Sequence, residues 1–200
     1  MGEDILPGEP VGPLPDSTRG RLLVATPSAM SDPNFDRTVV FVLEHASEGA
    51  LGLVLNRPSD LPVDEPLAPW AGITDPPSVV FVGGPVAPES VIGLVEGTPA
   101  SGVGTAEGWA DVAHGLASVD LSREPDSVGA VEHLRVFGGH SGWAPGQLEG
   151  EIAAGGWFVV DARRDDVFSP DPENLWHSVL ARQRGRLSWF ANAPDDPSNN

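Results

Sequence analysis

Short continuous runs of apolar residues constrain this chain more than any other feature of its sequence. Four of them contain β-branched residues, and three of the four lie next to Gly or Asn: 21–25, 39–43, 51–55 and 79–82. Runs of this length and composition are typical of buried strands rather than of helices. Because successive positions are apolar, both faces of each strand must be covered. The sequence therefore predicts a sheet with other structure packed on both sides.

Weaker runs extend the predicted sheet. They cover residues 91–95, 116–121, 134–137 and 157–160. Residues 44–50 separate the second and third of the stronger runs and contain Gly49, so we expect a hairpin there.

One helix is well marked near the C-terminus. Asp171 and Pro172 have the residue types of an N-cap and a first helical position. Leu175, Trp176, Val179 and Leu180 then form a single apolar stripe, and residues 182–185 carry the Arg and Gly residues of a helix end.

Two further helices are expected. One begins at Pro145 and continues through Leu148 and Ile152 to 155–156, and a shorter one lies near residues 67–70. Strands outnumber helices and do not alternate with them strictly, so the fold class is α+β.

The length of 200 residues favours one domain with loose ends. Residues 1–18 and 192–200 are polar, rich in Pro and poor in apolar residues, and we expect a disordered acidic arm and a disordered tail. The single α+β domain is therefore expected to span residues 19–191.

The chain is strongly acidic, with a net charge of −18. Residues 19–194 hold 23 acids against 11 Arg, which leaves −12 on the expected domain. A body with this charge repels phosphate backbones, so direct nucleic-acid binding is not expected. The N-terminus lacks the pattern of a signal peptide and no apolar run is long enough to cross a bilayer, so we expect no membrane contact and a cytoplasmic location.

Several kinds of chemistry lack the residues they need. The chain has no Cys and no Lys, which excludes thiolate metal sites, Schiff bases and a phosphate-binding loop. Residues 102–107 miss the third Gly of a dinucleotide fingerprint. The five His show no metal-ligand spacing, and we expect His45, at a strand end, to be structural. The sequence therefore predicts no cofactor and no metal.

Ordered motifs between the strands carry a family resemblance. They occupy residues 20–27, 32–39, 49–58, 83–86 and 142–152, and the whole set spans about residues 20–190. The chain resembles the bacterial YqgE/AlgH family. The resemblance implies a mixed, largely antiparallel sheet that curls into a partial barrel with a few flanking helices. It implies no established biochemical activity, although one member's name is connected with transcriptional control. His140 departs from the pattern, because relatives usually carry an aromatic residue there.

The candidate site collects polar groups that follow apolar runs. Asn56 and Arg57 follow one run, Gly83 and Gly84 follow another, and a third segment runs from Gly138 to Gln147 and includes Gly139, His140, Ser141, Gly142 and Trp143. Polar backbone at the ends of strands needs partners, so we expect these segments to meet at one concave site. The third segment is expected to be a tight turn into a helix, where free N–H groups favour an anion.

Each of these residues also has a structural interpretation. Asn56 has the residue type of a turn, and Arg57 has that of an ion-pair partner. Ser141 lies two residues after Gly139, as in a nucleophile elbow, but Trp143 stands where that motif needs its second Gly.

Three functions remain open at this point. The preferred one is a non-catalytic binding or regulatory module, with a cleft for a small anionic ligand or for a peptide of a protein partner. The alternative is a hydrolase-like enzyme. The third is a transcriptional regulator that contacts DNA, which the charge disfavours.

Overall fold

The computed structural model describes residues 17–27, 36–100, 107–185 and 187–191. Its centre is a sheet of ten strands. The strands are β1 (Arg21–Ala25), β2 (Val39–Ala46), β3 (Gly49–Val54), β4 (Pro58–Pro62), β5 (Val79–Val82), β6 (Val86–Pro99), β7 (Trp109–Ala113), β8 (Leu116–Val119), β9 (Gly129–Trp143) and β10 (Trp157–Asp161).

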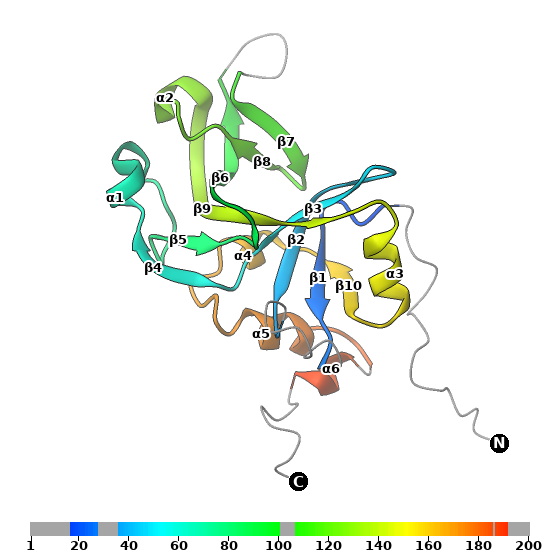
Figure 1. Ribbon diagram of the computed structural model, residues 1–200. Helices are drawn as coiled ribbons and strands as arrows, with labels where there is room; N and C mark the ends of the chain where they lie inside the picture. Colours follow the sequence, from blue (N-terminus) through cyan, green and yellow to red (C-terminus); the bar gives the residue numbers. More distant parts are fainter. Residues whose placement is uncertain (1–16, 28–35, 101–106, 186, 192–200) are drawn as a thin grey trace, which may run out of the picture.

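The strand order is β10-β1-β2-β3-β9-β6-β8-β7, with antiparallel neighbours throughout. β5 adds to β9 in parallel and carries β4 on its other side. Figure 1 shows the long strands β6 and β9 joining two halves, with β7 and β8 at the end opposite the C-terminal helices. The structure is an open, curled, mostly antiparallel sheet with a few helices, which confirms the predicted α+β class.

Short helices flank the sheet. They are α1 (Asp64–Leu67), η2 (Ala68–Trp70), α2 (Pro125–Val128), α3 (Gln147–Ala153), α4 (Arg164–Val167), α5 (Leu175–Ala181) and α6 (Leu187–Phe190). In the described part of the chain, no helix has the length and apolar character needed to span a bilayer.

The apolar runs are buried on both faces, as their composition predicts. In β2, Val39 and Phe41 pack into a cluster that contains the buried face of α5, whereas Val40 and Val42 pack into a second cluster that contains Leu148 of α3. A third cluster lies in the half of the sheet that contains β6, β8 and β9. Two helices on opposite faces thus explain why successive residues of one strand are apolar.

Helix α5 starts later than the sequence indicates. Its N-cap is Asn174, and the carbonyl of Pro172 accepts a hydrogen bond from the Leu175 N–H in a turn before the helix. The expected cap at Asp171 is therefore wrong. The apolar stripe of the helix is correct, since Leu175, Trp176, Val179 and Leu180 are all buried.

The hairpin of β2 and β3 is confirmed, but its connection is shorter than residues 44–50. Glu44, His45 and Ala46 pair with β3, so only Ser47 and Glu48 form the turn.

The sequence analysis did not predict two of the strands. β4 and β7 contain Pro, Ser, Ala and Asp and expose several positions, so neither presents a continuous apolar run.

The described chain begins with two residues that contact the domain. Ser17 Oγ donates to the His45 carbonyl, and the Thr18 N–H donates to His45 Nδ1 at 2.9 Å. The other ring nitrogen of His45 lies 3.1 Å from Glu149 Oε1. His45 therefore ties residues 17 and 18 to β2 and to α3, which is a structural function. The remainder of the predicted arm and tail, 1–16 and 192–200, lies outside the described residues.

Candidate functional site

The three segments of the predicted site come together in the structure. The Arg57 carbonyl accepts from the Val82 N–H at 2.8 Å, and the Gly83 N–H donates to the Gly138 carbonyl at 2.9 Å. Ser141 Oγ lies 3.4 Å from the Gly83 carbonyl oxygen. These bonds join the end of β3, the end of β5 and the C-terminal half of β9. Whether a ligand binds at this junction stays a prediction.

Glycine is required at this junction by close backbone approach. A Cβ on Gly83 would lie 2.3 Å from the Gly139 carbonyl oxygen, and one on Gly84 would lie 2.2 Å from the carbonyl carbon of His140. Any side chain would force the two strands apart. The glycines that suggested space for a ligand in the sequence are thus explained by the packing of one strand end against another.

The third segment is not the turn that the sequence suggests. Residues up to Trp143 belong to β9, and α3 begins only at Gln147. Extension of the strand satisfies the backbone through the pairs of Leu51 with Gly142 and of Val86 with His140. The backbone N–H groups expected to bind an anion at a strand-to-helix turn are therefore mostly engaged in the sheet.

Ser141 is buried, with 1% of its surface exposed. Its hydroxyl donates to the Gly83 carbonyl, and no hydrogen bond described for it involves a histidine. A nucleophilic serine needs an adjacent base and access to substrate. The geometry of Ser141 gives no support to the hydrolase alternative.

Asn56 has a structural function that the sequence analysis weighed. Its Oδ1 accepts from the Val39 N–H at 2.9 Å, and its Nδ2 donates to the Arg37 carbonyl at 2.8 Å. Both ends of the amide are therefore used to fasten the start of β2.

The side chains of Trp143 and Gln147 form hydrogen bonds on the α3 side of the sheet. Gln147 Nε2 donates to Glu151 Oε1, and Trp143 Nε1 donates to Glu151 Oε2, each at 2.8 Å. Trp157 donates to the same Oε2, also at 2.8 Å. This network holds α3 on the sheet.

A cavity of about 460 Å³ lies beside the predicted junction rather than within it. None of the ten predicted site residues lines it, but two of its lining residues pair directly with the junction. Leu51 pairs with Gly142, and Val91 pairs with Gly138. The cavity is therefore one strand removed from the junction, on neighbouring strands of the same sheet.

We call this cavity the seam pocket, because it lies between edge strand β7 and the end of β2, where the curled sheet does not close. Its floor is apolar and continues the core cluster that α5 covers, with Leu43, Leu51, Ile92 and Val112 lining it. The exposed side chain of Val91 lines it as well. A volume of this size is ordinary for a ligand pocket.

The rim of the seam pocket is mainly acidic. Glu44, Asp111 and Asp120 line it together with one cation, Arg19. Arg19 Nη2 donates to the Asp111 carbonyl at 2.9 Å, and Trp109 Nε1 donates to Asp111 Oδ1 at 3.1 Å. The indole thus fixes one rim carboxylate in place.

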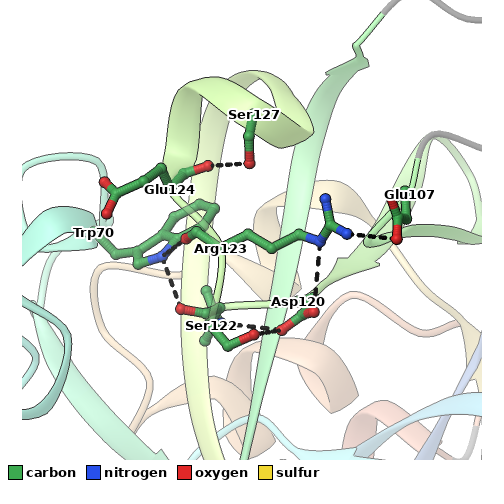
Figure 2. A network of polar contacts seen from close by, with 8 residues as sticks. Trp70, Glu107, Asp120, Ser122, Arg123, Glu124 and Ser127 are labelled. Carbon is green, nitrogen blue, oxygen red and sulfur yellow. Dashed lines mark hydrogen bonds and ion pairs between the residues drawn. The ribbon is translucent and has the colours of Figure 1, made fainter.

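Asp120 is fixed by a second network, shown in Figure 2. The N–H and hydroxyl of Ser122 both donate to Asp120 Oδ1, at 3.0 and 2.6 Å, and Arg123 lies 3.7 Å from Oδ2. The hydrogen bond from the Ser122 hydroxyl, followed by that from its backbone, lowers the pKa of Asp120, and Arg123 adds to the effect. Since Arg123 offsets the charge of Asp120, Glu44 and Asp111 dominate the acidic rim.

A second, smaller cavity of about 150 Å³ contains an oriented histidine. His133 Nδ1 lies 2.8 Å from Asp75 Oδ1, and Asp75 Oδ2 accepts from the Leu134 N–H. No hydroxyl or thiol is among the side chains lining this cavity. In the described residues, no group of three or more His, Asp or Glu is placed to hold a metal ion.

The sequence analysis missed most of the seam pocket. Its apolar floor was assigned to strands, but β7 was not recognised, and Glu44 was placed in a turn. One signal was present: Trp109 and Asp111 stand two residues apart, where they share one face of a strand.

The fold class of this protein is α+β, an open, curled, mostly antiparallel sheet with a few helices. Comparison with known proteins gives the family. The model of the AlgH-like family matches residues 22–188, and the chain belongs to that family. A Streptomyces coelicolor UPF0301 protein is 50% identical over 186 residues, which cover 92% of this chain and 96% of the relative. A Mycolicibacterium smegmatis relative is 37% identical over the full length of both chains.

Two solved structures share the fold. The crystal structure of protein DIP2367 from Corynebacterium diphtheriae has a TM-score of 0.78 and 34% identity, covering 92% of this chain and 95% of that one. The solution structure of the AlgH protein from Pseudomonas aeruginosa has a TM-score of 0.65 and 28% identity, covering 92% and 98%. These similarities support the family and its fold and assign no activity.

Proposed function

We propose that this protein is a non-catalytic binding module whose site is the seam pocket, and that it takes an extended peptide of a protein partner. The observation that carries the proposal is the combination of an apolar floor with an acidic rim in one cavity of about 460 Å³. A concave apolar surface with a few fixed polar groups is the usual form of a recognition site.

The charge of the rim supports a peptide over a small anion, the two ligand classes that the sequence left open. With Asp120 offset by Arg123, Glu44 and Asp111 still outnumber Arg19, the one Arg that lines the pocket, which disfavours a small anion, and the net charge of −18 acts in the same direction. A peptide with apolar and basic side chains fits both parts of the pocket. Its apolar side chains cover the floor, and its Arg or Lys pairs with Glu44 and Asp111.

A peptide titration tests the proposal. The probe is an acetylated, amidated pentapeptide Val-Arg-Val-Arg-Val, and the comparison peptide has Glu in place of both Arg. We expect the Arg peptide to bind by calorimetry and to shift the backbone NMR signals of Leu51, Val91 and Ala110, whereas the Glu peptide does neither. Shifts confined to residues outside the seam pocket, or equal binding of both peptides, would contradict the proposal.

Charge variants refine the same test. Glu44→Gln removes a rim carboxylate and should weaken binding of the Arg peptide about five-fold, as expected for one partly exposed ion pair. Glu132→Gln is the matched control, because Glu132 is exposed on β9 and lines neither described cavity. Its affinity should equal that of the wild type.

A further inference from the structure

The free edge of β7 forms one wall of the seam pocket. Within the described residues, β7 is the last strand in the sheet order and pairs only with β8. Residues from Gly108 to Val112 line the pocket, so the edge of the strand and not only its side chains borders the cavity. An edge strand presents unpaired N–H and C=O groups that can pair with another strand.

The register of β7 identifies which backbone groups face the pocket. The Asp120 N–H donates to the Gly108 carbonyl at 2.9 Å, and Ala110 stands opposite Ser118. Hydrogen-bonded and non-bonded pairs alternate in an antiparallel ladder. The backbone groups of Ala110 therefore point to β8, whereas those of Trp109 and Asp111 point away from β8, along the free edge.

One of these outward-facing backbone groups already accepts a hydrogen bond from a cationic side chain of the protein itself. The guanidinium of Arg19 donates to the Asp111 carbonyl at 2.9 Å. Arg19 is held there by its neighbours, since Thr18 bonds to His45, the Gly20 N–H donates to the Val42 carbonyl, and the Gly20 carbonyl lies 3.0 Å from His114 Nε2. Arg19 shows directly that an N–H donor with positive charge fits the edge of β7 beside the acidic rim.

From these contacts we infer that a segment of a protein partner adds to the free edge of β7 as a further strand. Its backbone pairs with Trp109 and Asp111 and replaces the Arg19 donor at the Asp111 carbonyl. Alternate side chains then face the floor of the seam pocket, where apolar residues fit, and basic residues reach Glu44 and Asp111. The inference rests on the proposed function and adds to it the mode of binding, β-strand addition.

N-methylated probes test the mode of binding separately from binding itself. Two variants of the Val-Arg-Val-Arg-Val peptide carry N-methyl groups on alternate residues, one variant on the odd and the other on the even positions. Side chains and charge stay the same, but only one variant loses the N–H groups that face β7. We expect that variant to bind at least about ten-fold more weakly than the parent peptide, because it loses backbone hydrogen bonds and its methyl groups clash with the edge. The other variant should keep most of the affinity.

Amide hydrogen exchange supplies an internal control. With the parent peptide bound, exchange at the Trp109 and Asp111 N–H groups should slow at least about ten-fold, whereas the Ala110 N–H, already bonded to β8, should change little. If both methylated peptides bind as tightly as the parent and the Trp109 and Asp111 amides are not protected, strand addition is wrong while the proposed pocket stands. If the parent peptide itself does not bind, the proposed function and this inference both fail.

Discussion

Arg135 has its guanidinium in the apolar core, with 2% of the residue exposed. Its Cζ lies 4.5 Å from the centroid of the Phe81 ring, and Nη2 donates to the Pro76 carbonyl at 2.9 Å. Among the described residues, its buried Nε and Nη1 have no hydrogen-bond partner. Burial lowers the pKa of Arg135 to about 10, against a smaller opposite effect of Asp75. A charged group with incomplete bonding in a core destabilises the fold.

The lowered pKa of Arg135 predicts an unusual dependence of stability on pH in the alkaline range. Above a folded pKa of about 10 and below the higher ordinary pKa of an Arg side chain, the unfolded chain binds more protons, so the free energy of unfolding rises with pH. The chain has no Lys, Tyr or Cys, so no other kind of side chain ordinarily titrates between about pH 9 and pH 11. Denaturant melts of the wild type should show a gain of roughly 1 kcal/mol across this range.

Arg135→Met should remove the alkaline gain and should not lower the stability at neutral pH, because an apolar side chain of similar length fills the same space. Arg184→Met is the matched control, since Arg184 is exposed, and it should keep the gain. A wild-type protein whose stability falls steadily from pH 9 to pH 11 would show that Arg135 keeps its proton throughout.

At the scale of elements, α5 shows how a local pattern becomes tertiary structure. Its stripe of four apolar side chains covers one face of β1 and β2 and joins their core cluster. Trp176 adds a specific bond, because its Nε1 donates to the Ala25 carbonyl at 2.9 Å. The helix is only seven residues long, so its stability comes from this packing rather than from helix propensity.

Trp176→Ala should be among the most destabilising single substitutions, at roughly 3–5 kcal/mol, because it leaves a large cavity and an unused carbonyl. Chemical denaturation monitored by circular dichroism measures the loss. Trp189→Ala on α6 removes the same side chain from a residue that is 74% exposed, and it should cost less than about 0.5 kcal/mol. Similar losses for the two variants would mean that burial of Trp176 is not what stabilises α5.

At the scale of the whole molecule, the strongest argument for the proposed kind of partner is charge. The net charge of −18 and the acidic rim of the seam pocket favour a basic partner over a phosphate backbone. The names of the relatives and solved structures compared above state no activity, and the name of the Pseudomonas aeruginosa AlgH protein describes no contact with DNA.

The purified protein should not bind duplex DNA, because it offers a phosphate backbone a net repulsive field. A gel shift at about 150 mM salt should show free duplex up to tens of micromolar protein, and lowering the salt should not produce a complex. A shifted band that strengthens as the salt concentration falls would support the alternative function, a transcriptional regulator that contacts DNA.

The sequence determined the strands of the core and the class of the fold, because continuous apolar runs report burial on both faces from local composition alone. It also indicated that Arg57, Gly83 and Ser141 would meet, since strand ends gather polar backbone. It did not determine what the meeting is for: Gly83 and Gly84 permit close packing, which depends on which strand arrives opposite them.

The position and the lining of the seam pocket could be known only from the tertiary structure. β7 carries too few consecutive apolar residues to be recognised, and it lies beside β2 only because β6 and β8 carry the chain across the sheet and back. Glu44 and Asp111 are separated by more than sixty positions in the chain, and nothing local to either indicates the other. A site built from distant residues is encoded in the packing of the whole sheet, which no single segment contains.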